Sequence, residues 1–91
     1  MGNGAYITME ERITTDKIAN MYSAAALHVT QINSLSGLSS ITDIQKNKIQ
    51  RLVEHLEAIK EYKKLDNTTS IWTTEDFGPI NAAITLGKTK Y

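Results

Sequence analysis

Residues 18–42 form a stretch of 25 residues that contains no Asp, Glu, Lys or Arg. Charged residues make up 22% of the whole chain, so this gap constrains the fold strongly. A helix at the surface of a small protein normally presents a charged face to water. Burying an unpaired charge costs far more than burying a hydroxyl or amide that finds a hydrogen-bond partner. The stretch therefore predicts a helix that its neighbours cover on two or more sides.

A regular stripe runs through this stretch, with positions spaced alternately three and four residues apart, as on one face of an α-helix. The stripe consists of Ile18, Met21, Ala25, His28, Ile32 and Leu35, with Tyr22 and Val29 beside it. The pattern predicts a helix over 16–36, with Asp16 near the positive end of the helix dipole and Gly37 as the stop. The remaining positions carry small or neutral polar side chains, which allow a second helix to approach closely.

A second, amphipathic helix is predicted over 43–64. Thr42 and Gln45 have the spacing of a capping box, in which each side chain bonds the backbone N–H of the other residue. The stripe of this helix consists of Ile49, Leu52, Leu56, Ile59 and Lys63, with Val53 beside it. Unlike the first helix, it has a strongly charged back. Because the connector between the two helices is short, we expect them to form an antiparallel hairpin.

The C-terminal part of the chain predicts a short third helix over 75–86. Pro79 suits the first position of such a helix, and Gly87 is a stop signal. Trp72 and Phe77 are the large aromatic residues of this segment. Side chains of this kind dominate the energetics of cores and interfaces, so we interpret both as anchors.

The predicted fold class is all-α, in one domain over 1–91: an extended N-terminal arm over 1–14, the helical hairpin and the short third helix. A chain of 91 residues buries only about 60–65% of its unfolded surface, so its core is marginal by itself. The absence of cysteine excludes disulfides and thiolate metal sites. Ten basic residues balance ten acidic ones, which argues against a dedicated nucleic-acid binder. Size and composition therefore favour association with a protein partner.

Two arrangements would cover the uncharged helix. In the first, this helix lies at the centre of a compact three-helix monomer. In the second, which we favour, the chain self-associates or is a subunit of a larger assembly. The contact face predicted for the second arrangement consists of Ile18, Met21, Tyr22, Ala25, Val29, Ile32, Trp72 and Phe77.

No group of residues in the sequence predicts catalysis or metal binding. His28 and His55 come to comparable height in an antiparallel hairpin, but a metal site needs three or four converging ligands. The carboxylates at 10–11 and 75–76 are neighbours in sequence, and such neighbours point in different directions on a helix. We therefore predict no catalytic residue, no cofactor, no metal and no enzymatic role. The two histidines are expected to be packed, with a weak effect of pH on association.

Residues 71–87 carry the spacing W-x4-F-x2-I-x3-I through Trp72, Phe77, Ile80 and Ile84. In this spacing the segment resembles stretches near the ends of small uncharacterised helical proteins encoded by tailed bacteriophages, including phages of marine and cyanobacterial hosts. The resemblance implies a phage-encoded protein and carries over no catalytic residue.

These features predict a structural or interaction protein, as a subunit of a homo-oligomer or of a phage assembly of the virion type. The expected partner is another copy of the chain or another protein of the assembly, with no nucleic acid and no membrane. We expect the protein in the cytoplasm of a bacterial host or in the virion. The alternative is a small phage-encoded inhibitor that binds a host protein or sequesters a small ligand between its subunits.

Overall fold

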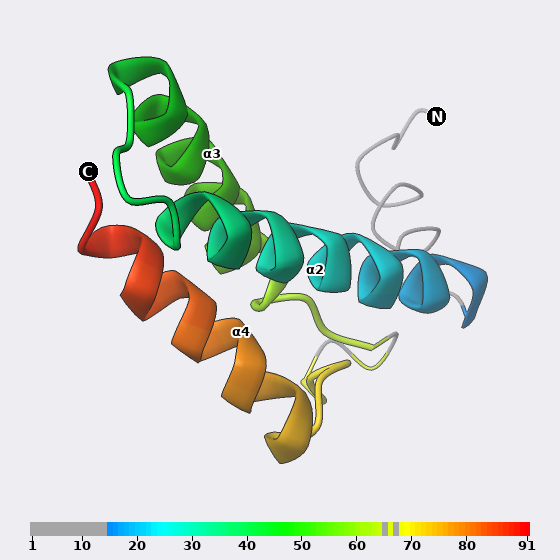
Figure 1. The fold of residues 1–91 in the computed structure, drawn as a ribbon. Helices are drawn as coiled ribbons and strands as arrows, with labels where there is room; N and C mark the ends of the chain where they lie inside the picture. Colours follow the sequence, from blue (N-terminus) through cyan, green and yellow to red (C-terminus); the bar gives the residue numbers. More distant parts are fainter. Residues whose placement is uncertain (1–14, 65, 67) are drawn as a thin grey trace.

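Three helices form the fold in the computed structural model, which describes residues 15–64, 66 and 68–91 (Figure 1). They are α2 (Thr15–Ser36), α3 (Asp43–Ile59) and α4 (Thr74–Lys88), and each contacts the other two. In the described part of the chain, the one strand-like pairing is an isolated bridge between Lys63 and Ser70. The all-α prediction is confirmed. The arm predicted over 1–14 lies outside the described residues.

The helices α3 and α4 begin with the same side-chain device. The Thr42 N–H donates to Gln45 Oε1 at 2.9 Å, and the Gln45 N–H donates back to Thr42 Oγ1 at 3.2 Å. This is the predicted capping box. At α4, the Thr73 N–H donates to Asp76 Oδ2 at 2.9 Å, and the Asp76 N–H donates to Thr73 Oγ1 at 3.1 Å. Both helix starts are therefore fixed by residues three positions apart.

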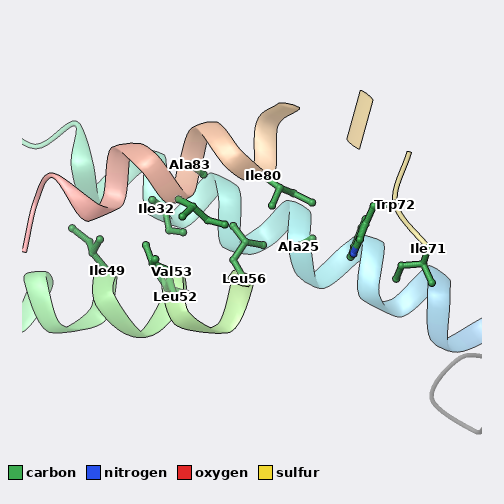
Figure 2. Packing of buried hydrophobic residues seen from close by; sticks show 11 residues of the cluster. Ala25, Ile32, Ile49, Leu52, Val53, Leu56, Ile71, Trp72, Ile80 and Ala83 are labelled. Carbon is green, nitrogen blue, oxygen red and sulfur yellow. The ribbon is translucent and has the colours of Figure 1, made fainter. Parts of the chain in front are cut away.

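The hydrophobic core lies where the three helices meet, and α2 and α3 run in opposite directions through it (Figures 1 and 2). Ile32 of α2 and Ile49, Val53 and Leu56 of α3 are fully buried there. Ile80, Ala83 and Ile84 supply the face of α4. Figure 2 shows Ile71 and Trp72 farther along α2, beyond Ala25, so the core continues beside the N-terminal half of that helix.

The sequence predicts Gly87 as the stop of α4, and this prediction is wrong. Gly87 lies buried inside the last turn of the helix. A Cβ atom at this position would come within 2.6 Å of Val53 Cγ2, 3.2 Å of Ile32 Cγ2 and 3.3 Å of Ile49 Cγ2. Only a residue without a side chain allows α4 to approach α2 and α3 this closely. The helix continues to Lys88, two residues beyond the predicted end at 86.

The prediction for Pro79 is also wrong, because this residue lies inside α4 rather than at its first position. The helix begins at Thr74, one residue before the predicted start, so Pro79 is its sixth residue. Proline has no N–H group. The carbonyl of Glu75 therefore lacks the donor that residue i+4 normally supplies.

The helix predicted over 43–64 ends at Ile59, five residues early. Beyond it, the chain turns back and pairs with itself: the Ile71 N–H donates to the Tyr62 carbonyl at 3.3 Å, and the Lys64 N–H donates to the Thr69 carbonyl at 2.7 Å. This turn brings the Trp72 indole N–H to the Ile59 carbonyl, at 3.0 Å. A long-range hydrogen bond thus takes a carbonyl at the end of α3. The helix predicted over 16–36 ends at Ser36, as α2 does. It begins one residue later than α2, which starts at Thr15.

Candidate interaction surface

From Ala19 to Ser34, one long side of α2 is exposed and carries no charge. Two helices, α3 and α4, pack against its other side, so α2 is covered by two neighbours, as its sequence predicts. The exposed side, which we call the open flank, consists of Ala19, Asn20, Ser23, Ala26, Leu27, Thr30, Asn33 and Ser34. Leu27 is 54% exposed. The flank thus offers water small, amide, hydroxyl and apolar groups over nearly the whole helix.

The residues predicted as a contact face mostly pack within the chain. Ala25, Ile32 and Trp72 are buried in the core. The half-buried members pack against that core: Ile18, Met21, Val29 and Phe77. Tyr22 is 40% exposed and stands at the border between the core and the open flank. All eight predicted residues therefore make contacts within the chain, Tyr22 through Trp72 and the Ile71 carbonyl. The open flank is the uncovered face of the same helix.

The sequence marks the positions of the open flank as small or neutral polar and suited to the close approach of a second helix, but it does not show that they stay exposed within the chain. The centre line of the flank, Ala19, Ser23, Ala26, Thr30 and Ser34, steps by four and three with small side chains only. A search for the apolar stripe of a helix passes over such a pattern. The absence of charge, rather than the presence of large apolar residues, is the feature that marks it.

A groove of about 360 Å³ adjoins the open flank, between α2 and the first turns of α4. Its apolar lining comes from Ala25, Val29, Trp72 and Ile80. The Tyr22 ring tilts against the Trp72 ring at 59°, with centroids 5.0 Å apart, and the Tyr22 hydroxyl donates to the Ile71 carbonyl. This contact fixes the aromatic wall of the groove.

The rim of this groove is acidic, and we call the whole groove, with its rim, the acidic groove. Glu75 and Asp76 line it, and none of the described residues that line it is basic. The hydroxyl of Thr30, another lining residue, already donates to the Ala26 carbonyl at 2.9 Å. Pro79 also lines the groove and deprives the Glu75 carbonyl of its helical donor. The groove therefore offers acceptors and negative charge above an apolar floor, which suits a cationic partner with an apolar part.

A second hollow, of about 480 Å³, lies on α3 and has the opposite character. Lys48 and Arg51 line it, together with Ile44, which is 80% exposed and is the most exposed large hydrophobic residue of the described chain. His55 lies at its far end. These four residues recur at steps of four, three and four, on one side of the helix. We call them the basic face.

His28 and His55 do meet between α2 and α3, at the comparable height that an antiparallel hairpin implies. No third ligand joins them: over the described residues, no group of three or more His, Asp or Glu side chains is arranged to hold a metal ion.

No protein-family model, no curated protein and no solved structure matches this chain. The likeness of 71–87 to phage proteins therefore stays a prediction. None of the helices in the described ranges is both long enough and apolar enough to cross a membrane.

Proposed function

We propose that this protein is a non-enzymatic, self-associating structural protein, and that the open flank of α2 contacts another copy of the chain. The observation that carries the proposal is the exposure of eight uncharged positions along one helix. The helix has 22 residues and is therefore roughly 33 Å long. In a protein that stayed monomeric, such a surface would gain nothing from the absence of charge, and charge would improve its solubility.

The chemistry of the open flank suits helix-to-helix contact. Ala19, Ser23 and Ala26 are small, so a second helix can approach α2 closely along this line. Asn20 and Asn33 can donate and accept hydrogen bonds across such an interface. Leu27 supplies an apolar side chain that gains stability when water is removed from it. An assembly of the virion type, as the resemblance of 71–87 implies, is one setting in which such a subunit works.

The test is the molar mass in solution, measured by light scattering coupled to size exclusion. We expect the wild-type chain to associate at micromolar concentration. The variants Ala19→Glu and Leu27→Glu place a charge on the open flank and are expected to shift the mass to that of the monomer. Their matched controls, Ala82→Glu and Leu38→Glu, change the same residue types at exposed positions elsewhere and should keep the wild-type mass.

Circular dichroism of each variant separates loss of contact from loss of fold, because all four positions are exposed. A wild-type chain that stays monomeric at high micromolar concentration contradicts the proposal. So does an Ala19→Glu, Leu27→Glu double variant that assembles like the wild type.

A second candidate function is that of a small phage-encoded inhibitor, which binds a host protein or holds a small ligand. The acidic groove favours it, because a volume of about 360 Å³ lies within the range of ligand sites. Trp72 lines this groove and is the one tryptophan of the chain. Its fluorescence would therefore report an occupant directly. A monomeric chain whose Trp72 emission shifts on binding a partner would favour this candidate over self-association.

A further inference from the structure

We propose that the basic face of one copy of this chain docks into the acidic groove of the next, with Ile44 entering the apolar floor. This inference rests on the proposed self-association. It names the part of the second copy, the basic face, that contacts the first copy beside the open flank. Tyr22, Ala26 and Thr30 belong to the α2 wall of the groove, so a copy seated there also covers part of the flank.

The groove has the features of a receiving site for an apolar side chain with a cationic neighbour. Its floor is apolar and is lined by Trp72 and Ile80 among others. Glu75 is exposed at the rim and makes no ion pair within the described part of the chain. An apolar side chain that enters the floor therefore brings any basic group beside it close to an available carboxylate.

The basic face has the complementary features. Ile44 is 80% exposed, which is unusual for a residue of its size, and its burial would remove apolar surface from water. Lys48 and Arg51 stand one and two turns along the same side of α3, and both are exposed. Among the described residues, the ion pair of the chain is Lys88 with Glu57, at 2.7 Å, so Lys48 and Arg51 keep their charges for another partner.

The positions of the two surfaces make the contact head to tail. Figure 1 shows the start of α3 at the top of the molecule and the start of α4 at the bottom, so one chain presents the two surfaces at opposite ends. A twofold contact of groove on groove would set Glu75 against Glu75, and like charges across an interface are unfavourable. A head-to-tail contact instead pairs opposite charges, and its repetition gives a ring or a filament.

Charge reversal tests the contact. We expect Lys48→Glu and Glu75→Lys, each alone, to weaken association about tenfold or more in dissociation constant, because each creates a like-charge contact. The matched controls are Lys46→Glu, on the other side of α3, and Glu61→Lys, beyond its end; both positions are exposed and line neither surface. Both controls should associate like the wild type.

Mixing gives the sharper measurement. A Glu75→Lys chain keeps an intact basic face, and a Lys48→Glu chain keeps an intact acidic groove. A 1:1 mixture should therefore associate more tightly than either variant alone, as measured by analytical ultracentrifugation. Variants that assemble like the wild type, or a mixture that does not recover, overturn this contact and leave the proposed self-association standing. A wild-type chain that is monomeric overturns both.

Discussion

His28 of α2 and His55 of α3 stack against each other, with ring centroids 5.4 Å apart and ring planes inclined by 13°. The Nδ1 atom of His28 is buried and, among the described residues, meets no hydrogen-bond partner. Burial lowers the pKa of His28 below its ordinary 6.5, and the nearby His55 lowers it further through charge repulsion. The contact between the two main helices therefore favours a neutral imidazole.

This pair predicts that the folded chain loses stability as the pH falls. Because the folded-state pKa of His28 lies below 6.5, the unfolded chain binds more protons than the folded chain below that pH. The contribution to stability is complete above pH 6.5 and is lost as the pH falls from there toward the lowered pKa. Urea denaturation, followed by circular dichroism at a series of pH values, should show a midpoint that decreases across this window.

Two variants separate the causes. His28→Gln removes the titrating group, so the decrease of the midpoint between neutral pH and the lowered pKa should largely disappear. His55→Gln removes the smaller cause only, so the decrease should become shallower but persist. A wild-type midpoint that is flat across the window, or a His28→Gln variant with an unchanged slope, would show that this contact does not sense pH.

The two glycines of α4 are predicted to respond differently to the same substitution. At Gly87 a new Cβ would lie 2.6 Å from Val53 Cγ2, so Gly87→Ala forces α4 away from α3. Overpacking of this kind costs typically 1–3 kcal/mol, which exceeds the roughly 1 kcal/mol that alanine gains in a helix. We expect a net loss of about 1 kcal/mol in the free energy of unfolding, measured by urea denaturation.

Gly78→Ala is the matched control within the same helix. Apart from its neighbours in the chain, nothing lies within 4 Å of the Cβ that alanine would add at Gly78, and the position is exposed. Gly78 precedes Pro79, whose ring disfavours the helical backbone for a preceding residue that carries a Cβ. This cost and the helix-propensity gain oppose each other, so the variant should stay within about 0.5 kcal/mol of the wild type. Equal effects of the two substitutions would contradict the close approach at Gly87.

The local features of this fold could be predicted from the sequence, and the long-range ones could not. The Thr42–Gln45 box needs only two residues three positions apart, so its pattern is sufficient. At the end of α3, the Ile59 carbonyl accepts from the indole N–H of Trp72, 13 residues later, as well as from the Tyr62 N–H. The spacing of three and four residues continues past that point to Lys63, and no local signal shows that the helix stops at Ile59. Gly87 likewise resembles a helix stop until α2 and α3 are placed against it.

For the open flank and the acidic groove, too, the sequence predicts the local property but not the tertiary one. The absence of charge over 18–42 is a property of composition and predicts cover on more than one side. Which face of α2 remains exposed depends on where α3 and α4 pack, and the sequence pattern of α2 alone does not determine this. The acidic groove is still less visible, because it brings Tyr22 together with residues 50 or more positions later in the chain.

The Trp72 side chain is predicted to couple the end of α3 to the start of α4. Its indole N–H donates to the Ile59 carbonyl, and its ring packs against Tyr22. Trp72→Phe keeps an aromatic ring but removes the indole donor to the Ile59 carbonyl, which then keeps the Tyr62 N–H at 3.1 Å, and it reduces the buried apolar area. We expect a loss of about 2 kcal/mol in the free energy of unfolding, measured by circular dichroism.

Tyr22→Phe provides the comparison, because it removes only the hydroxyl that donates to the Ile71 carbonyl. Its expected cost is about 1 kcal/mol, in line with a single hydrogen bond. If Trp72→Phe were no more costly than Tyr22→Phe, the indole N–H would have no special part in fixing the end of α3.

Asp66 is predicted to titrate far below an ordinary aspartate. Its carboxylate accepts hydrogen bonds from the Thr69 hydroxyl, from the Thr69 N–H at 2.8 Å and from the Thr68 N–H at 2.9 Å. These bonds favour the charged form and lower its pKa from 3.8 to about 2, with the Thr69 hydroxyl as the largest cause. A carbon-detected NMR titration of the side-chain carboxyl should give a midpoint near 2.

Thr69→Val identifies the cause, because valine keeps the shape of threonine but removes its hydroxyl. The pKa of Asp66 should rise toward 3.8 without reaching it, since the two backbone N–H donors remain. Thr68→Val should have a much smaller effect, because the Thr68 hydroxyl is the least of the lowering causes. Because the folded-state pKa is depressed, this turn contributes stability above pH 3.8 and loses it as the pH falls toward 2. An Asp66 pKa that is the same in Thr69→Val and the wild type would mean that the hydroxyl does not bond the carboxylate in solution.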